Sequence, residues 1–173
     1  MPVPCVLIVC YGNPLRSDDG IAWRAADVLE GKFADTDLEI LRLHQLTPEV
    51  ADSLRQRDLV LFVDAACTDD VKNSRPGEIM VNELSTMEIR KHGPGQFSHI
   101  YSPAKVLDLA RELYNAIPRA YAITVAGENF GHGECLSAPV ASALHKLALT
   151  IEQLVEHAIA KSRATKQTKY PAS

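Results

Sequence analysis

Three short segments made almost entirely of apolar residues constrain the fold of this chain more than any other feature of its sequence. They are residues 3–10 (VPCVLIVC), 59–64 (LVLFVD) and 121–126 (YAITVA). None of them alternates regularly between apolar and polar residues, as a strand with one face in water does. A near-continuous apolar run is typical of a parallel strand that is covered by helices on both faces. The three segments therefore predict a buried, parallel sheet.

Two further strands and four helices are expected around these segments. Residues 38–43 form a strand, and residues 78–83, which follow Pro76 and Gly77, form an edge or antiparallel strand. The alternation of strands and helices is typical of an α/β protein. We predict a single-domain, three-layer sandwich with a twisted, mainly parallel five-stranded sheet and helices on both faces. The helices are expected at residues 18–31 with Ser17 as the cap, from Thr47 and Pro48 to about residue 57, from Ser102 and Pro103 to about residue 116, and at residues 138–161.

The size and charge of the chain limit its function further. Its 173 residues suit one domain, assigned to residues 1–160, followed by a basic, flexible tail at residues 161–173. The net charge of −4 argues against a nucleic-acid partner, because such binding depends on neutralising phosphates. No membrane-spanning run and no export signal is present, so we expect a cytoplasmic protein without a membrane partner. The four cysteines form no C-x-x-C pair and are expected to be free thiols, and a monomer is the default expectation.

Acidic residues follow two of the predicted strands. Ligands of α/β sheets bind beyond the carboxyl ends of the strands, which is where the loop after the first strand carries Asp18 and Asp19. Adjacent carboxylates repel phosphate and suit a cation, although Asp18 also fits the ordinary role of an acid in the first turn of a helix. Asp19 is the stronger functional candidate, because Gly20 beside it allows close approach of the backbone. Asp64 ends a buried strand, where a carboxylate is costly unless it is paired, hydrogen-bonded or bound to a metal.

A histidine completes the candidate site. His99 lies just before the helix expected at Pro103. Two carboxylates and one imidazole leave coordination positions open and suit a divalent metal such as Ni, Fe, Mn or Zn, whereas a closed structural zinc site needs four ligands. His44, after the second strand, is a rival ligand, and Cys67 is a weaker one.

Other kinds of site lack their sequence motifs. The loop at residues 12–20 (GNPLRSDDG) contains neither the G-x-G-x-x-G fingerprint of a dinucleotide site nor the Gly-Lys-Ser/Thr of a P-loop. G-x-S-x-G and H-E-x-x-H are also missing from the sequence. The acidic first loop disfavours a flavin phosphate. A catalytic Cys–His pair stays open, although Cys5 and Cys10 fall within the first buried strand.

Several segments of the sequence resemble the NiFe-hydrogenase maturation proteases. They are the loop at residues 12–20, the strand at residues 58–64 with Pro76-Gly77 beyond it, the Ser98-His99 segment that runs into SPAKVLDLA, and the closing GENFGHGECLSAPV. The resemblance covers about residues 3–160. Ala22 departs from it, because the family often has glycine there.

The resemblance implies both a fold and an activity. The fold is a mainly parallel sheet flanked by helices. The activity is that of an endopeptidase that removes the C-terminal extension of a hydrogenase large-subunit precursor after nickel insertion. The nickel is supplied by the substrate, and no organic cofactor is needed. By position, the nickel-recognising residues of the family correspond to Asp19, Asp64 and His99.

The roles of other residues in the predicted site are less fully assigned. We expect Gly12 and Asn13 to contact the substrate, together with His44, whose segment resembles a variant found in part of the family. The general base stays open among Asp18, Asp19 and Asp64.

Two alternatives to a protease stay open. A receiver-type signalling domain also carries acids after its first strand and a phospho-acceptor aspartate after its third. Against this, Asp18 lies eight residues beyond Cys10, and Gly127-Glu128-Asn129 offers no lysine after the last strand. The second alternative is a non-enzymatic chaperone that uses the same three ligands for nickel or for the precursor.

Overall fold

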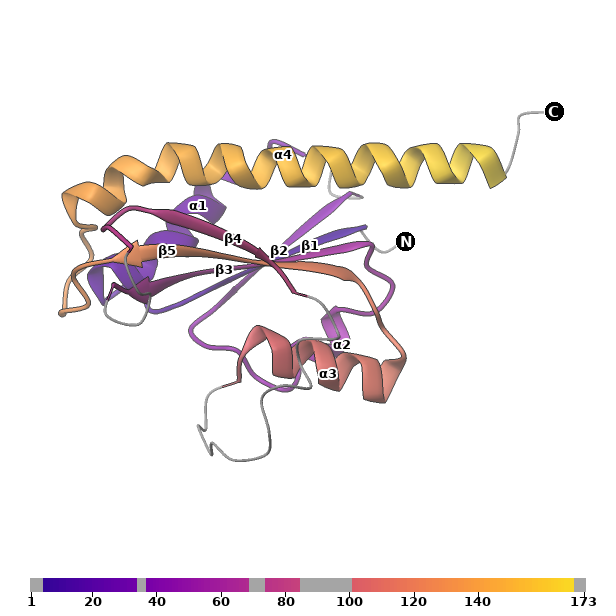
Figure 1. Cartoon of the computed structure of the whole chain (residues 1–173), viewed down its shortest axis with the longest axis horizontal. Coiled ribbons are helices and arrows are strands. Elements are labelled where there is room, and N and C mark those ends of the chain that lie inside the picture. Colours follow the sequence, from indigo (N-terminus) through magenta and orange to yellow (C-terminus); the bar gives the residue numbers. More distant parts are fainter. Residues whose placement is uncertain (1–4, 34–36, 69–73, 85–100, 170–173) are drawn as a thin grey trace.

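In the computed structural model of the chain, five described strands form one sheet in the order β2-β1-β3-β5-β4 (Figure 1). The structure describes residues 5–33, 37–68, 74–84 and 101–169, with side chains as far as residue 164. The parallel strands are β1 (Val6–Tyr11), β2 (Leu38–Leu43), β3 (Leu59–Cys67) and β5 (Arg119–Gly127). The edge strand β4 (Ile79–Glu83) runs antiparallel to β5. The predicted α/β sandwich is therefore confirmed, including its antiparallel edge.

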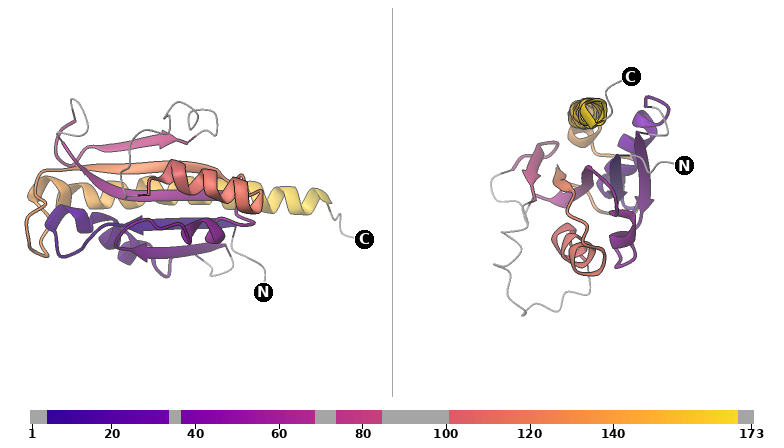
Figure 2. Two further views of the ribbon diagram at one scale, coloured as in Figure 1. Left: turned by 90° about the horizontal axis from the view of Figure 1, so that it is seen from below. Right: turned by 90° about the vertical axis from the view of Figure 1, so that its right-hand side faces the viewer.

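Helices cover both faces of the sheet. Helices α1 (Ile21–Leu29) and α4 (Ala138–Lys169) lie on one face, and α2 (Val50–Ser53) and α3 (Pro103–Tyr114) lie on the other (Figures 1 and 2). Successive side chains of a strand point to opposite faces, so β1 supplies Val6, Ile8 and Cys10 to the first core and Leu7 and Val9 to the second. This double coverage explains why the buried strands show no polar alternation.

The prediction that the first helix begins at residue 18 is wrong. Residues Ser17–Gly20 form a separate 3-10 turn, η1, and α1 begins at Ile21. Ser17 is not a helix cap: it has a φ of 49° and its hydroxyl donates to the carbonyl oxygen of Gly131 at 3.3 Å. The reason is that the carboxylate of Asp18 turns into the protein interior, where it is fully buried, instead of facing solvent on a helix.

Several predicted boundaries also differ. The helix expected from Thr47 to about residue 57 is regular only over Val50–Ser53, with hydrogen-bonded turns on either side. Strand β3 continues to Cys67, because its pairing with β5 extends that far. Asp64 therefore lies inside the strand and not at its end. The last helix continues to Lys169, beyond the end of the sheet (Figure 2), whereas α3 begins as predicted, with the Ser102 hydroxyl accepting from the backbone N–H of Lys105 at 3.3 Å.

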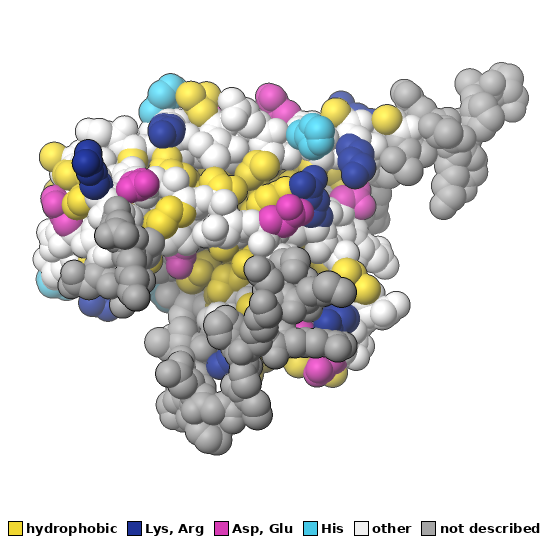
Figure 3. Space-filling model, viewed as in Figure 1, with side chains coloured by type: hydrophobic (Ala, Val, Ile, Leu, Met, Phe, Trp, Pro, Cys, Tyr) yellow, Lys and Arg dark blue, Asp and Glu magenta, His cyan; other side chains and the backbone are white. Residues whose placement is uncertain are grey.

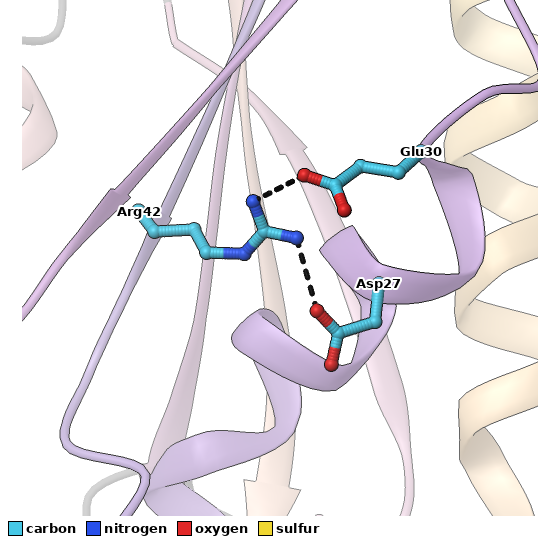
Figure 4. Close-up of polar contacts among 3 residues, drawn as sticks. All are labelled: Asp27, Glu30 and Arg42. Atoms are coloured by element: carbon cyan, nitrogen blue, oxygen red, sulfur yellow. Dashed lines mark hydrogen bonds and ion pairs between the residues drawn. The ribbon is translucent and has the colours of Figure 1, made fainter.

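An arginine on β2 ties α1 to the sheet. Arg42 Nη1 donates to Glu30 Oε1 at 2.6 Å, and its Nη2 donates to Asp27 Oδ1 at 3.0 Å (Figure 4). The hydrogen bond from Arg42 lowers the pKa of Glu30. Such partly exposed pairs contribute little stability each, but they balance the acidic groups at the C-terminal end of α1 with a cation.

The described surface has mixed charge on the face that Figure 3 presents. Basic and acidic side chains are interspersed there among apolar ones (Figure 3). None of the described helices combines the length and the apolar character that a membrane span requires.

Candidate functional site

The candidate site lies at the carboxyl edge of the parallel strands. Strands β1, β3 and β5 are neighbours there, and the η1 turn that follows β1 packs against β3. This is the edge at which ligands of open α/β sheets bind. It places Asp19 of η1 and Asp64 of β3 at the same edge of the sheet, where the charge of Asp19 contributes to raising the pKa of Asp64.

Asp64 is held between two hydroxyl groups. It pairs directly with Thr124 of β5, and Tyr11 of β1 lies level with it, because the preceding residues Cys10 and Val63 are paired. Tyr11 Oη donates to Asp64 Oδ2 at 2.9 Å, and Thr124 Oγ1 donates to Asp64 Oδ1 at 2.9 Å. Each carboxylate oxygen thus accepts one hydrogen bond and keeps lone-pair capacity for a further partner.

Burial raises the pKa of Asp64 from its ordinary value of 3.8 to about 6. Desolvation is the largest cause, and the charge of Asp19 adds to it. The hydrogen bonds from Thr124 and Tyr11 act in the opposite direction, because they favour the ionised carboxylate. Burial also raises the pKa of Tyr11, and the charge of Asp64 raises it further, so this hydroxyl keeps its proton and remains a donor.

Asp19 is positioned by the backbone of the first loop. Its Oδ2 accepts from the backbone N–H of Asn13 at 2.9 Å. Its carbonyl oxygen would lie only 2.2 Å from a Cβ placed at Gly12, where φ is +135°. Only glycine fits both this close approach and this backbone conformation. Gly12 and Asn13 therefore hold Asp19 in place, and their predicted contact with substrate stays a prediction.

The two acids have no cationic partner in the described part of the chain. Its ion pairs involve neither Asp19 nor Asp64, in contrast to Asp27 and Glu30 with Arg42. Neutral hydroxyl and N–H groups orient the carboxylates without neutralising them. The arrangement is chemically suited to a cation that comes from outside the chain.

Asp18 has a different environment and connects two loops. Its Oδ2 accepts from the backbone N–H groups of Glu128 at 3.0 Å and Asn129 at 2.9 Å and from the Ser137 hydroxyl at 2.9 Å. Its Oδ1 accepts from the backbone N–H of Ser137 at 2.7 Å. The residue is fully buried. Asp18 therefore ties the loop after β5 to the loop after β1, and the geometry leaves Asp19 and Asp64 as the acids that are available for chemistry.

The histidine of the predicted trio, His99, lies outside the described residues, so its ligand role stays a prediction. Tyr101, two positions later, packs against the same apolar cluster as Tyr11. Within the described residues alone, no group of three His, Cys, Asp or Glu side chains is able to hold a metal.

The rival ligands lie elsewhere on this edge. His44 follows β2 and is exposed, and its ring centroid lies 5.3 Å from that of Trp23. Cys67 ends β3 and is partly buried. Cys5 and Cys10 are buried, and desolvation raises the pKa of Cys10 to about 12, which disfavours a thiolate nucleophile there.

Sequence reasoning missed the partners of the acids, namely Tyr11, Thr124 and Ser137. The strand pattern alone does not give the register that brings Tyr11 and Thr124 level with Asp64. Tyr11 did carry a signal, since it is the first residue with a polar group after an apolar run.

Comparison with known proteins identifies the fold. No family model matches the sequence, and no curated protein matches it. Among solved structures, the hydrogenase maturating endopeptidase HybD from E. coli is similar with a TM-score of 0.70 at 20% identity, over 91% of this chain and 93% of that one. The NiFe-hydrogenase maturation protease HybD from Thermococcus kodakarensis is similar with a TM-score of 0.64 at 22% identity, over 90% of this chain and 99% of that one.

A third structure agrees with these two. The NiFe-hydrogenase maturation protease HycI from Thermococcus kodakarensis KOD1 is similar with a TM-score of 0.65 at 20% identity, over 87% of this chain and 92% of that one. The chain thus shares the fold of the hydrogenase maturation proteases along most of its length.

Replacing Asp18 by asparagine is expected to destabilise the protein strongly. The amide would place an NH₂ group against N–H and O–H donors, and the charge-assisted hydrogen bonds would be lost. We expect a loss of about 3 kcal/mol in the free energy of unfolding, measured by urea denaturation. Asp52→Asn is the matched control, since it alters only an exposed pair with Arg55 and should cost roughly 0.5 kcal/mol or less. Equal effects of the two substitutions would contradict the role of Asp18.

Replacing Asp64 by asparagine is expected to stabilise the protein at neutral pH. Because the pKa of Asp64 is raised in the folded state, its ionised form makes folding less favourable as pH rises from about 4 to 6. Asparagine removes this cost and is still able to bond both hydroxyls, which donate or accept. The free energy of unfolding of Asp64→Asn should exceed that of the wild type by on the order of 2 kcal/mol at pH 7 and match it at pH 4. Urea denaturation at both pH values tests this, and a difference independent of pH would contradict it.

Proposed function

We propose that this chain is an endopeptidase that removes the C-terminal extension of a NiFe-hydrogenase large-subunit precursor once nickel has been inserted. The observation that carries the proposal is the Asp19–Asp64 pair. Both carboxylates lie at the ligand-binding edge of the sheet and are oriented by neutral donors, and the charge of Asp19 contributes to raising the pKa of Asp64. The shared fold with maturation endopeptidases supports it.

The donor set fits a divalent metal that arrives with the substrate. Asp19 and Asp64 offer oxygen ligands, and His99, by its resemblance, would supply an imidazole. This combination suits borderline divalent ions such as nickel. The resemblance to the NiFe-hydrogenase maturation proteases implies that the nickel belongs to the precursor. The chain would then need no metal or organic cofactor of its own.

Electrostatics would make this pair selective for a loaded precursor. Docking an empty precursor would desolvate two like charges further with nothing to compensate them. A nickel ion between the carboxylates removes that cost and favours docking. Recognition of correct metal insertion then follows from the charge of the site.

The reaction is hydrolysis of a peptide bond near the nickel. Water adds to the carbonyl carbon, the C–N bond breaks, and the released amine takes a proton. The nickel would polarise the carbonyl or the attacking water. Asp19 and Asp64 are the candidates for the general base, whereas the oxygens of Asp18 are buried and engaged with four donors.

The alternatives receive less support. Receiver domains have the parallel strand order 2-1-3-4-5, whereas this sheet has β5 inside and an antiparallel β4 at the edge. A chaperone that uses the same ligands would bind the precursor without shortening it, so the mass of the precursor after incubation separates the two.

Incubation of the purified chain with nickel-loaded precursor should release a C-terminal peptide, detected as a mass difference in the precursor. Asp19→Asn, Asp64→Asn and His99→Ala should each slow release by more than the roughly 10–100-fold that residues around a metal's ligands contribute. Asp52→Asn should leave the rate unchanged.

Three outcomes would count against the proposal. Cleavage of nickel-free precursor at the same rate would contradict the role of nickel. Wild-type rates in the three ligand variants would contradict the assignment of Asp19, Asp64 and His99 to the site. Binding of the loaded precursor without a mass change would favour the chaperone.

A further inference from the structure

We propose that Tyr11 is a positioning residue for nickel recognition: together with Thr124, its hydroxyl fixes the Asp64 carboxylate in the orientation in which Asp64 and Asp19 bind one ion. This inference rests on the proposed function and adds a residue to it that no predicted ligand set contains. Tyr11 itself does not touch the metal or the reacting peptide bond.

The hydrogen bonds come from the two strands on either side of Asp64. Tyr11 lies on β1 and Thr124 on β5, and both donate at 2.9 Å to different oxygens of the carboxylate. All three side chains share the face of the sheet that α2 and α3 cover. The three-strand register therefore decides where the carboxylate points.

Two donors are needed to fix a carboxylate. The terminal torsion of aspartate is broad, so a carboxylate with one hydrogen bond still rotates about its last bond. One donor on each oxygen sets the plane of the group and leaves the remaining lone pairs directed away from both donors. A ligand whose orientation is set beforehand loses less conformational entropy when the ion binds.

Uncharged donors suit this task better than cations. An arginine or lysine in the place of Tyr11 would orient Asp64 and also neutralise it, as Arg42 does for Asp27 and Glu30 (Figure 4). A hydroxyl orients the carboxylate and leaves its negative charge for the incoming ion. Partners of this kind around metal ligands typically change metal affinity by about 10–100-fold.

The inference is tested by nickel titration of the 173-residue chain, with Ni²⁺ alone as the probe and calorimetry as the readout. Tyr11→Phe removes the hydroxyl and retains the ring, and Thr124→Val removes the other donor at constant shape. Each should weaken Ni²⁺ binding by roughly 10–100-fold, with nickel-saturated and nickel-free melting temperatures recorded for every variant.

Tyr121→Phe is the matched control. Tyr121 lies on β5, as Thr124 does, but it packs in the cluster on the opposite face of the sheet. The centroid of its ring lies 5.1 Å from the guanidinium carbon of Arg119. This variant should bind Ni²⁺ as the wild type does. A purely structural role of Tyr11 would lower the melting temperature and leave the nickel affinity of the folded protein unchanged, and that result would overturn the inference.

The outcomes also separate this inference from the proposed function. If the wild type binds Ni²⁺ through Asp19 and Asp64 but does not cleave the precursor, the proposed protease activity fails and the titration still decides the role of Tyr11. If the wild type binds no Ni²⁺ at millimolar concentration, there is no ion for Tyr11 to position and the inference is overturned. Wild-type nickel affinity in Tyr11→Phe overturns it whatever the cleavage result.

Discussion

The site depends on the hydrogen bonds that the buried carboxylate of Asp18 accepts from the loop after β5. Four donors from the loop after β5 converge on its two oxygens, and the backbone of the same loop bonds Ser17 and Asp18 in return. Because Asp19 is the next residue, its direction is set by this connection. The loops after β1 and β5, far apart in the sequence, are thus joined through Asp18 and together support Asp19 at the edge of the sheet.

Three acids of one chain take different roles because their surroundings differ. Asp18 is saturated with donors and is structural. Asp64 accepts two hydroxyl bonds and remains costly to ionise, with a pKa of about 6. Asp19 accepts a backbone N–H and lies partly exposed beside it. Asp19 and Asp64 thus share one edge of the sheet, and no lysine or arginine among the described residues neutralises either of them.

The sheet was largely predictable and the site only in part. Unbroken apolar runs identified β1, β3 and β5, and Pro76-Gly77 marked the antiparallel edge. The predicted role of Ser17 as a helix cap is wrong, because tertiary hydrogen bonds to Asp18 outweigh the local preference for a cap. Tyr11 and Thr124 were not found, since their contact with Asp64 depends on register between strands, which no local pattern contains. His99 stays a prediction from resemblance.

The sequence separation of the Asp64 contacts has a consequence for the newly made chain. Its two hydroxyl partners lie 53 and 60 residues away along the chain, one on each side. Contacts over such separations form late in folding, so a chain that ends before β5 contains the acids but lacks one of the two donors that orient Asp64. The geometry of Asp64 is therefore a property of the assembled sheet: it forms only once β1, β3 and β5 lie side by side.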